Sequence, residues 1–124
     1  MGFVLVFIGS GLGGAARHGV NVACLRAFGP GFPVATLVVN VAGSFAMGLV
    51  AALFALKAGA SAEMRLLLAT GILGGFTTFS AFSLDAVSLW QRGEALAAGA
   101  YVAGSVAFSI AGLLAGLAAA RVMA

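Results

Sequence analysis

The sequence predicts an all-α membrane protein whose 124 residues form one domain of four transmembrane helices. Hydrophobic residues make up 63% of the chain, charged residues only 7%, and the mean hydropathy is +1.20, values outside the range of soluble globular domains. The few charges separate uncharged segments, each close to or longer than the ~20 residues that a spanning helix needs. These segments are residues 1–16, 27–56, 66–84 and 95–120.

Each of the four helices has recognisable ends. The first, expected at about 3–25, is rich in glycine, and it is interpreted as a retained helix because no basic residue precedes its apolar run. A loop of glycine and proline at 29–33 precedes the second helix, which runs to about residue 56. After a loop at 57–62, Ser61 is expected to cap a third helix that reaches about residue 90. The fourth is expected from about 94 to 121.

The third helix is expected to be broken inside the membrane, near Gly74 and Gly75. Residues 71–83 read Gly-Ile-Leu-Gly-Gly-Phe-Thr-Thr-Phe-Ser-Ala-Phe-Ser, without a charge. Irregular backbone at membrane depth is tolerated only where protein or a water-filled cavity satisfies its polar groups, so the break indicates a binding or permeation site. The released carbonyls, helped by a threonine hydroxyl, would suit a hard cation such as Na⁺.

The basic residues do not favour one orientation in the membrane. With four helices, both chain ends and the second loop share one side, and each side then carries three basic residues. They are Lys57, Arg65 and Arg121 on that side, and Arg17, Arg26 and Arg92 on the other. This balance permits dual topology, in which the chain inserts both ways and pairs with itself as an antiparallel dimer; a fixed topology is an equal alternative. The basic residues are too scattered for a nucleic-acid-binding patch.

Polar residues recur every four positions on the second and fourth helices. On the second, Asn40 lies between Thr36 and Ser44 near the middle of the span. Its carboxamide offers two N–H donors to an anion, although a hydrogen bond to a neighbouring helix explains it equally well. Thr36 and Ser44 are more typical of helix packing.

On the fourth helix, Tyr101, Ser105 and Ser109 form a ladder of hydroxyls along one face. Hydroxyls can donate to a passing anion without a fixed charge that would trap it, whereas the serines alone are more often packing residues. Gly112 and Gly116 form a GxxxG motif that predicts a helix contact.

Two phenylalanines of the third helix, Phe79 and Phe82, point to nearly the same side. Because ring edges carry partial positive charge, they could hold a dehydrated anion, although packing is their commoner role. The hydroxyls of Thr78, Ser80 and Ser83 surround them and complete the candidate anion pathway. At the end of the first helix, Arg17 is a candidate for an anion-attracting vestibule, with snorkelling towards the interface as the default alternative.

Segment 71–83, together with Gly14-Ala-Ala-Arg17, Asn40, and Tyr101 with its two serines, closely resembles the Fluc (CrcB) family of fluoride channels. The resemblance spans all four helices. It implies a channel rather than an enzyme: a dual-topology antiparallel homodimer in the cell (inner or plasma) membrane, with two pores through which fluoride leaves passively, giving fluoride resistance.

The resemblance also implies roles for single residues. It implies a structural Na⁺ on the two-fold axis, bound by backbone oxygens of Gly74 and Thr77. It implies that Phe79 and Phe82 line the pore and that Asn40 contacts the ion. Tyr101, Ser105 and Ser109 would form a polar track.

A small dual-topology proton-coupled exporter is the alternative function. It would share the size, the four helices and the balanced charge. Proton coupling needs a titratable group at mid-membrane, however, and the three acidic residues, Glu63, Asp85 and Glu94, lie towards the helix ends. The sequence therefore favours the channel.

Overall fold

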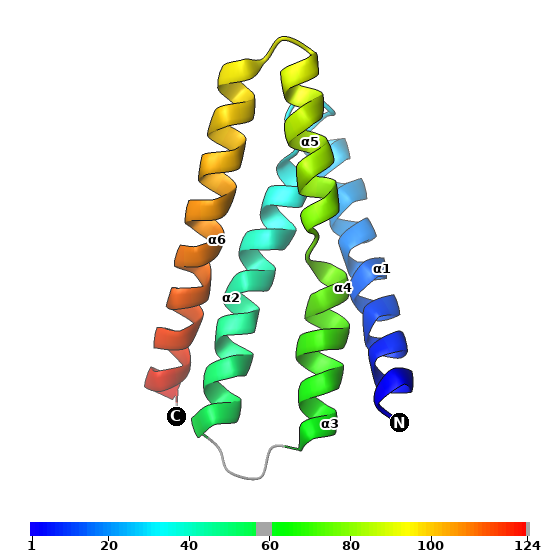
Figure 1. The fold of residues 1–124 in the computed structure, drawn as a ribbon, viewed down its shortest axis with the longest axis vertical. Coiled ribbons are helices and arrows are strands. Elements are labelled where there is room, and N and C mark those ends of the chain that lie inside the picture. The colour runs from blue at the N-terminus through cyan, green and yellow to red at the C-terminus, as the bar shows by residue number, and fades with distance from the viewer. Residues whose placement is uncertain (57–60, 124) are drawn as a thin grey trace.

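The computed structural model describes residues 1–56 and 61–123, which form a bundle of four long helical spans (Figure 1). All four are long and apolar enough to cross a membrane, as predicted. The first, second and fourth spans are continuous, and the third is divided into several helical segments. The elements are α1 (Gly2–Phe28), α2 (Val34–Leu56), α3 (Ala62–Arg65), the π-helix η1 (Leu66–Leu73), α4 (Gly74–Phe76), α5 (Phe79–Gln91) and α6 (Ala95–Met123).

The first turn of α1 and the last turn of α6 lie at the same end of the bundle, and the α1–α2 and α5–α6 connections lie at the other (Figure 1). This arrangement follows from an even number of spans. At the end that carries the termini, the Ser61 hydroxyl accepts a hydrogen bond from the Met64 amide at 3.0 Å, which confirms the predicted cap. The preceding loop was predicted at 57–62, and its residues 57–60 lie outside the described part of the chain.

The third span is broken at Thr77 and Thr78, slightly beyond the predicted position. Both residues have extended backbone, with ψ angles of 159° and 124°. Gly74 and Gly75 remain helical, since α4 begins at Gly74. Gly75 serves close packing instead: a Cβ atom there would lie 2.8 Å from the Cα of Ser10 on α1. The eight residues before Gly74, Leu66–Leu73, form a π-helix that the sequence did not predict.

Glycines let the spans approach in two pairs. α2 packs along α6, where Gly48 and Gly116 face one another so closely that a Cβ on either would overlap a backbone carbonyl oxygen of the other helix. α1 packs along η1 and α4, and a Cβ on Gly9 would lie 2.8 Å from the Cα of Gly71. The predicted packing roles of the first helix and of the GxxxG motif are therefore confirmed for these glycines.

Few side chains are buried in this single chain. A small cluster of Leu89, Ala98 and Tyr101 joins α5 to α6, and Leu37 and Phe82 pack against it. The outward faces of the four spans carry many exposed apolar side chains, as expected for helices surrounded by lipid or by another chain. The first part of the broken third span, η1 and α4, packs mainly against α1, whereas α5 packs mainly against α6.

Candidate functional site

Asn40 fixes the shape of the helix break from α2. Its Oδ1 accepts a hydrogen bond from the Thr78 amide at 2.8 Å, and its Nδ2 donates to the Thr78 carbonyl at 3.0 Å. These bonds satisfy backbone groups that an unbroken helix would have paired internally. A carboxamide has two N–H donors, so one N–H of Asn40 remains for another acceptor. Both interpretations of Asn40, helix contact and ion contact, are compatible with this geometry.

Threonine hydroxyls end one helix and begin the next. Thr77 Oγ1 donates to the Leu73 carbonyl at 2.9 Å, in the last turn before the break. Thr78 Oγ1 accepts from the Ala81 amide at 3.1 Å and is the N-cap of α5. Side chains of this type compete with helix hydrogen bonds, which explains why the chain breaks at the threonines rather than at the glycines.

The hydroxyls of Ser80 and Ser83 also lie close to this turn. Ser80 Oγ is 3.4 Å from Thr78 Oγ1, and Ser83 Oγ donates to the Phe79 carbonyl at 3.0 Å. Neither serine lines the cavity described below. Of these three predicted hydroxyls, Thr78 alone therefore combines a position at the break with a place in the cavity wall.

A cavity of about 330 Å³ opens beside the break, between α2, α5 and α6. Polar side chains and two aromatic rings share its wall with apolar ones. It is lined by Asn40, Ser44, Thr77, Thr78, Phe79, Phe82, Ser105, Val106, Ser109 and Ile110. The fold thus brings together most of the predicted pathway residues from three separate segments of sequence.

The Ser105 hydroxyl is the unusual group in this cavity. The residue is 4% exposed, and its Oγ has no hydrogen-bond partner within the described part of the chain. A buried hydroxyl left unpaired costs free energy, roughly 1–3 kcal/mol, unless a ligand or water satisfies it. Because Ser105 belongs to the cavity wall, its hydroxyl is a candidate contact for a polar occupant.

The two phenylalanines of α5 lie against each other, with ring centroids 5.6 Å apart and planes at 62°. Phe82 is partly buried and its ring centroid lies 5.3 Å from that of Tyr101. Phe79 is 78% exposed and projects from the surface of the single chain. The pair therefore extends from the small core to an exposed face of the single chain.

Tyr101 is only 1% exposed and donates its hydroxyl hydrogen bond to Asp85 Oδ2 at 3.0 Å. This bond joins α6 to α5. Tyr101 does not line the cavity, whereas Ser105 and Ser109 do. Sequence reasoning did not pair Asp85 with Tyr101. The available signal was the cost of a carboxylate within an apolar span, which calls for a hydrogen-bonding partner.

Arg17 reaches the broken span instead of snorkelling away from it. Its Nε donates to the Gly75 carbonyl at 3.2 Å. It lines a second cavity of about 260 Å³, whose polar wall also includes His18, Asn21, Thr36 and Thr78.

Thr36 and Ser44, interpreted from sequence as packing residues, each line one of the two cavities. Their four-residue spacing from Asn40, which places all three on one face of the helix, was the sequence signal that could have indicated this role.

The backbone near the break fits the proposed oxygen ligands of a hard cation. In an unbroken helix the Thr78 amide would bond to the Gly74 carbonyl, but here it donates to Asn40. Thr77 is extended, so its carbonyl also leaves the helical direction. Carbonyl oxygens are ligands that hard cations prefer. Two from one chain would fill only part of a coordination shell.

The fold and the site define a four-span membrane protein with a polar cavity at a broken third helix. A family described as CrcB-like protein, Camphor Resistance (CrcB), matches residues 4–117. A relative from Nitrobacter hamburgensis, named fluoride-specific ion channel FluC 2, is 51% identical over 121 residues that cover 98% of each chain. The chain belongs to the CrcB family, as its resemblance implied.

Two further relatives carry the name fluoride-specific ion channel FluC. The protein from Rhodopseudomonas palustris is 55% identical over 98% of each chain, and that from Methylobacterium nodulans is 56% identical over 95% of this chain and 94% of its own. These names describe channels and not enzymes. Together with the four spans, they make this chain a multi-pass membrane protein, of the inner membrane in bacteria.

Proposed function

We propose that this chain forms a fluoride-selective passive ion channel that exports fluoride across the cell membrane. The observation that carries the proposal is the unpaired hydroxyl of Ser105, a residue in the wall of the cavity beside the break. Asn40 has one N–H donor left in the same wall, which Phe79 and Phe82 also line. The relatives at 51–56% identity are named as fluoride channels, which supports the choice of ion.

Fluoride is small and strongly hydrated, so a pore must replace its water with several weak donors. Hydroxyls and one amide N–H can do so without binding the ion too tightly to release it. Asn40, Ser105 and Ser109 would contact the ion along this wall. Tyr101 would continue the polar track, with its hydroxyl held by Asp85. Arg17 would draw anions towards the other face of the break.

The channel is proposed to be an antiparallel homodimer with two pores and a structural Na⁺ at its axis. The balanced basic residues support dual insertion, and the exposed Phe79 ring supports a second chain covering this face. Gly74 and Thr77 of each copy would provide backbone oxygens to the Na⁺, which would hold the two broken helices together and take no part in conduction.

Efflux from liposomes tests the proposed function. Vesicles that contain the purified protein are loaded with potassium fluoride, and efflux is recorded after valinomycin is added, with chloride-loaded vesicles in parallel. Rapid fluoride release with chloride retained is expected. No release from verified dimer, or release that requires a proton gradient, would overturn the channel and in the second case favour the proton-coupled exporter.

Two variants separate the ring contact from folding. Phe79→Ile and Phe82→Ile should each lower fluoride efflux while leaving the dimer intact on size exclusion, because isoleucine keeps the bulk but has no positive ring edge. Unchanged efflux in both would contradict the ring-edge contact.

A further inference from the structure

The turn between α5 and α6 brings two opposite charges together. Gly93, at φ 81°, donates to the Trp90 carbonyl at 3.0 Å, and the Glu94 amide donates to the Leu89 carbonyl at 3.0 Å. This pair of bonds is the Schellman motif, which ends a helix at a glycine in the left-handed region. The turn places Arg92 and Glu94 on either side of Gly93, where their side chains meet.

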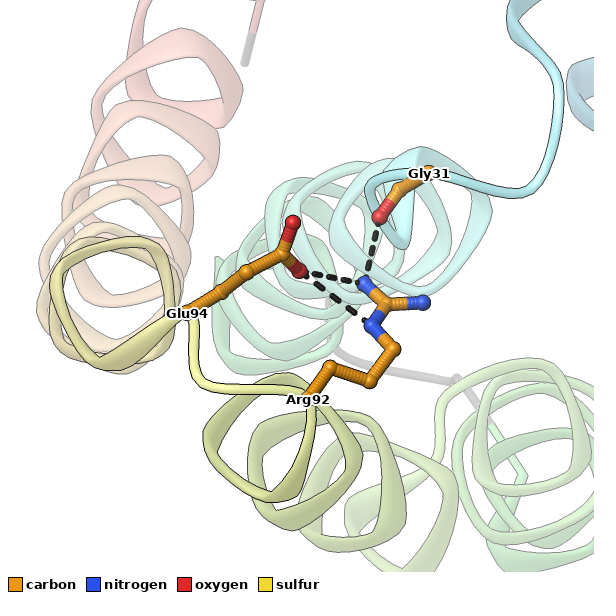
Figure 2. A network of polar contacts seen from close by, with 3 residues as sticks. All are labelled: Gly31, Arg92 and Glu94. Atoms are coloured by element: carbon orange, nitrogen blue, oxygen red, sulfur yellow. Dashed lines mark hydrogen bonds and ion pairs between the residues drawn. The ribbon is translucent and has the colours of Figure 1, made fainter.

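The Arg92 guanidinium ties this turn to the α1–α2 loop (Figure 2). Its terminal nitrogen donates to Glu94 Oε2 at 2.7 Å and to the Gly31 carbonyl at 2.7 Å, and Nε lies 3.2 Å from the same carboxylate oxygen. Both side chains are about half exposed, at 48% and 49%. Ion pairs this exposed contribute little to stability. The main effect of the arrangement is therefore electrostatic, because it fixes the positions of two opposite charges at this turn.

Arg92 and Gly31 line a cavity of about 200 Å³ beneath the loop. Asp85 lies in the same wall, with its carboxylate bonded to Tyr101. The wall also contains Asn21 and Thr36, which line the Arg17 cavity as well, and that cavity reaches Thr78 at the break. The two cavities therefore follow one another from this end of the bundle to the broken helix.

We propose that the cavity beneath the α1–α2 loop is an entrance for anions, and that Arg92 and its counter-charge Glu94 set the electrostatic potential at its rim. This inference rests on the proposed function. Arg92 and Asp85 line the cavity with opposite charges, Glu94 pairs with Arg92 at the rim, and Arg26 adds a positive charge in the last turn of α1 at the same end. Glu94 offsets the positive charge with which Arg92 attracts anions, so removing Glu94 would raise anion capture at this rim.

The effect of one charge can be estimated. A unit charge at ~10 Å in water changes the energy of a passing anion by about 0.4 kcal/mol, which corresponds to about a twofold change in its local concentration. Salt suppresses this effect, since the Debye length falls from about 30 Å at 10 mM to about 3 Å at 1 M. Ionic strength therefore distinguishes a charge that attracts ions from a residue that only maintains the turn.

The test measures fluoride efflux from liposomes at a low fluoride concentration, with potassium gluconate at about 10 mM or about 1 M on both sides. At low salt, Glu94→Gln should raise efflux about twofold and Arg92→Gln should lower it about twofold. Arg92→Lys, which keeps the charge, should stay near the wild-type rate. All of these differences should disappear at high salt.

A matched control is Glu63→Gln, which removes a carboxylate at the opposite end of the third span and should leave efflux unchanged. Glu94→Gln and Arg92→Gln both remove the ion pair, so a purely structural role would move them in the same direction at both salt concentrations. That result, or unchanged efflux in Glu94→Gln, would overturn the inference alone. A wild-type protein without fluoride efflux would instead overturn the proposed function and this inference with it.

Discussion

The carboxamide of Asn40 makes two hydrogen bonds to the backbone of Thr78, 38 residues away: it accepts from the amide at 2.8 Å and donates to the carbonyl at 3.0 Å. A side chain of α2 thereby helps to fix the position at which the third span is interrupted. The threonine hydroxyls then cap the two helix ends that this interruption creates. The break is held by side chains from two spans, which keeps irregular backbone satisfied at membrane depth.

Replacing Asn40 with aspartate tests this arrangement, because the side chain keeps its shape. Asn40→Asp retains an acceptor for the Thr78 amide but loses the donor to its carbonyl. We expect a loss of about 1–3 kcal/mol in stability, and an additional loss of fluoride efflux because the new charge repels anions. Thermal unfolding in detergent and liposome efflux measure the two effects. Normal conduction would restrict Asn40 to a packing role, and Asn40→Leu supplies the uncharged control.

Replacing Ser105 with alanine should separate conduction from stability. Since the buried hydroxyl has no partner within the described residues, Ser105→Ala should not destabilise the protein and should stabilise it by up to about 1–3 kcal/mol. Fluoride efflux should fall about fivefold, the equivalent of one hydrogen bond of ~1 kcal/mol to the passing ion. Ser10→Ala on α1, outside this cavity, is the control. Efflux equal to wild type would assign Ser105 to packing.

Tyr101 and Asp85 should behave as a coupled pair. Tyr101→Phe removes the hydroxyl bond at 3.0 Å and leaves a carboxylate oxygen without that donor, so we expect a cost of about 1–3 kcal/mol. In a double-mutant cycle with Asp85→Asn, the coupling energy should be at least about 0.5 kcal/mol. Unfolding in detergent by a graded denaturant measures each variant. Additive effects of the two substitutions would show that the bond contributes nothing to stability.

The sequence predicted the spans well because their signal is composition over about 20 residues, which lipid imposes directly on the chain. It placed the break two or three residues early, since glycine suggests backbone freedom, whereas the threonine hydroxyls and a tertiary contact from Asn40 together hold the break at Thr77 and Thr78. The same limit hid the Asp85 partner of Tyr101 and the approach of Arg17 to Gly75, because each joins residues from different spans. Periodicity along one helix indicates a shared face but does not identify the opposite helix.

The crossing of α2 and α6 gives a final prediction about folding rather than conduction. A Cβ on Gly48 would overlap the Leu113 carbonyl oxygen and lie 3.1 Å from the Cα of Gly116, and neither backbone atom can move without displacing its helix. Gly48→Ala should therefore cost about 1–3 kcal/mol, despite the better helix propensity of alanine. Gly99→Ala on α6, where a Cβ would meet no other atom within 4 Å, is the matched control and should be neutral or stabilising. The comparison is made by thermal unfolding in one detergent, and equal melting temperatures for the two variants would mean that the helices can separate at Gly48 without loss.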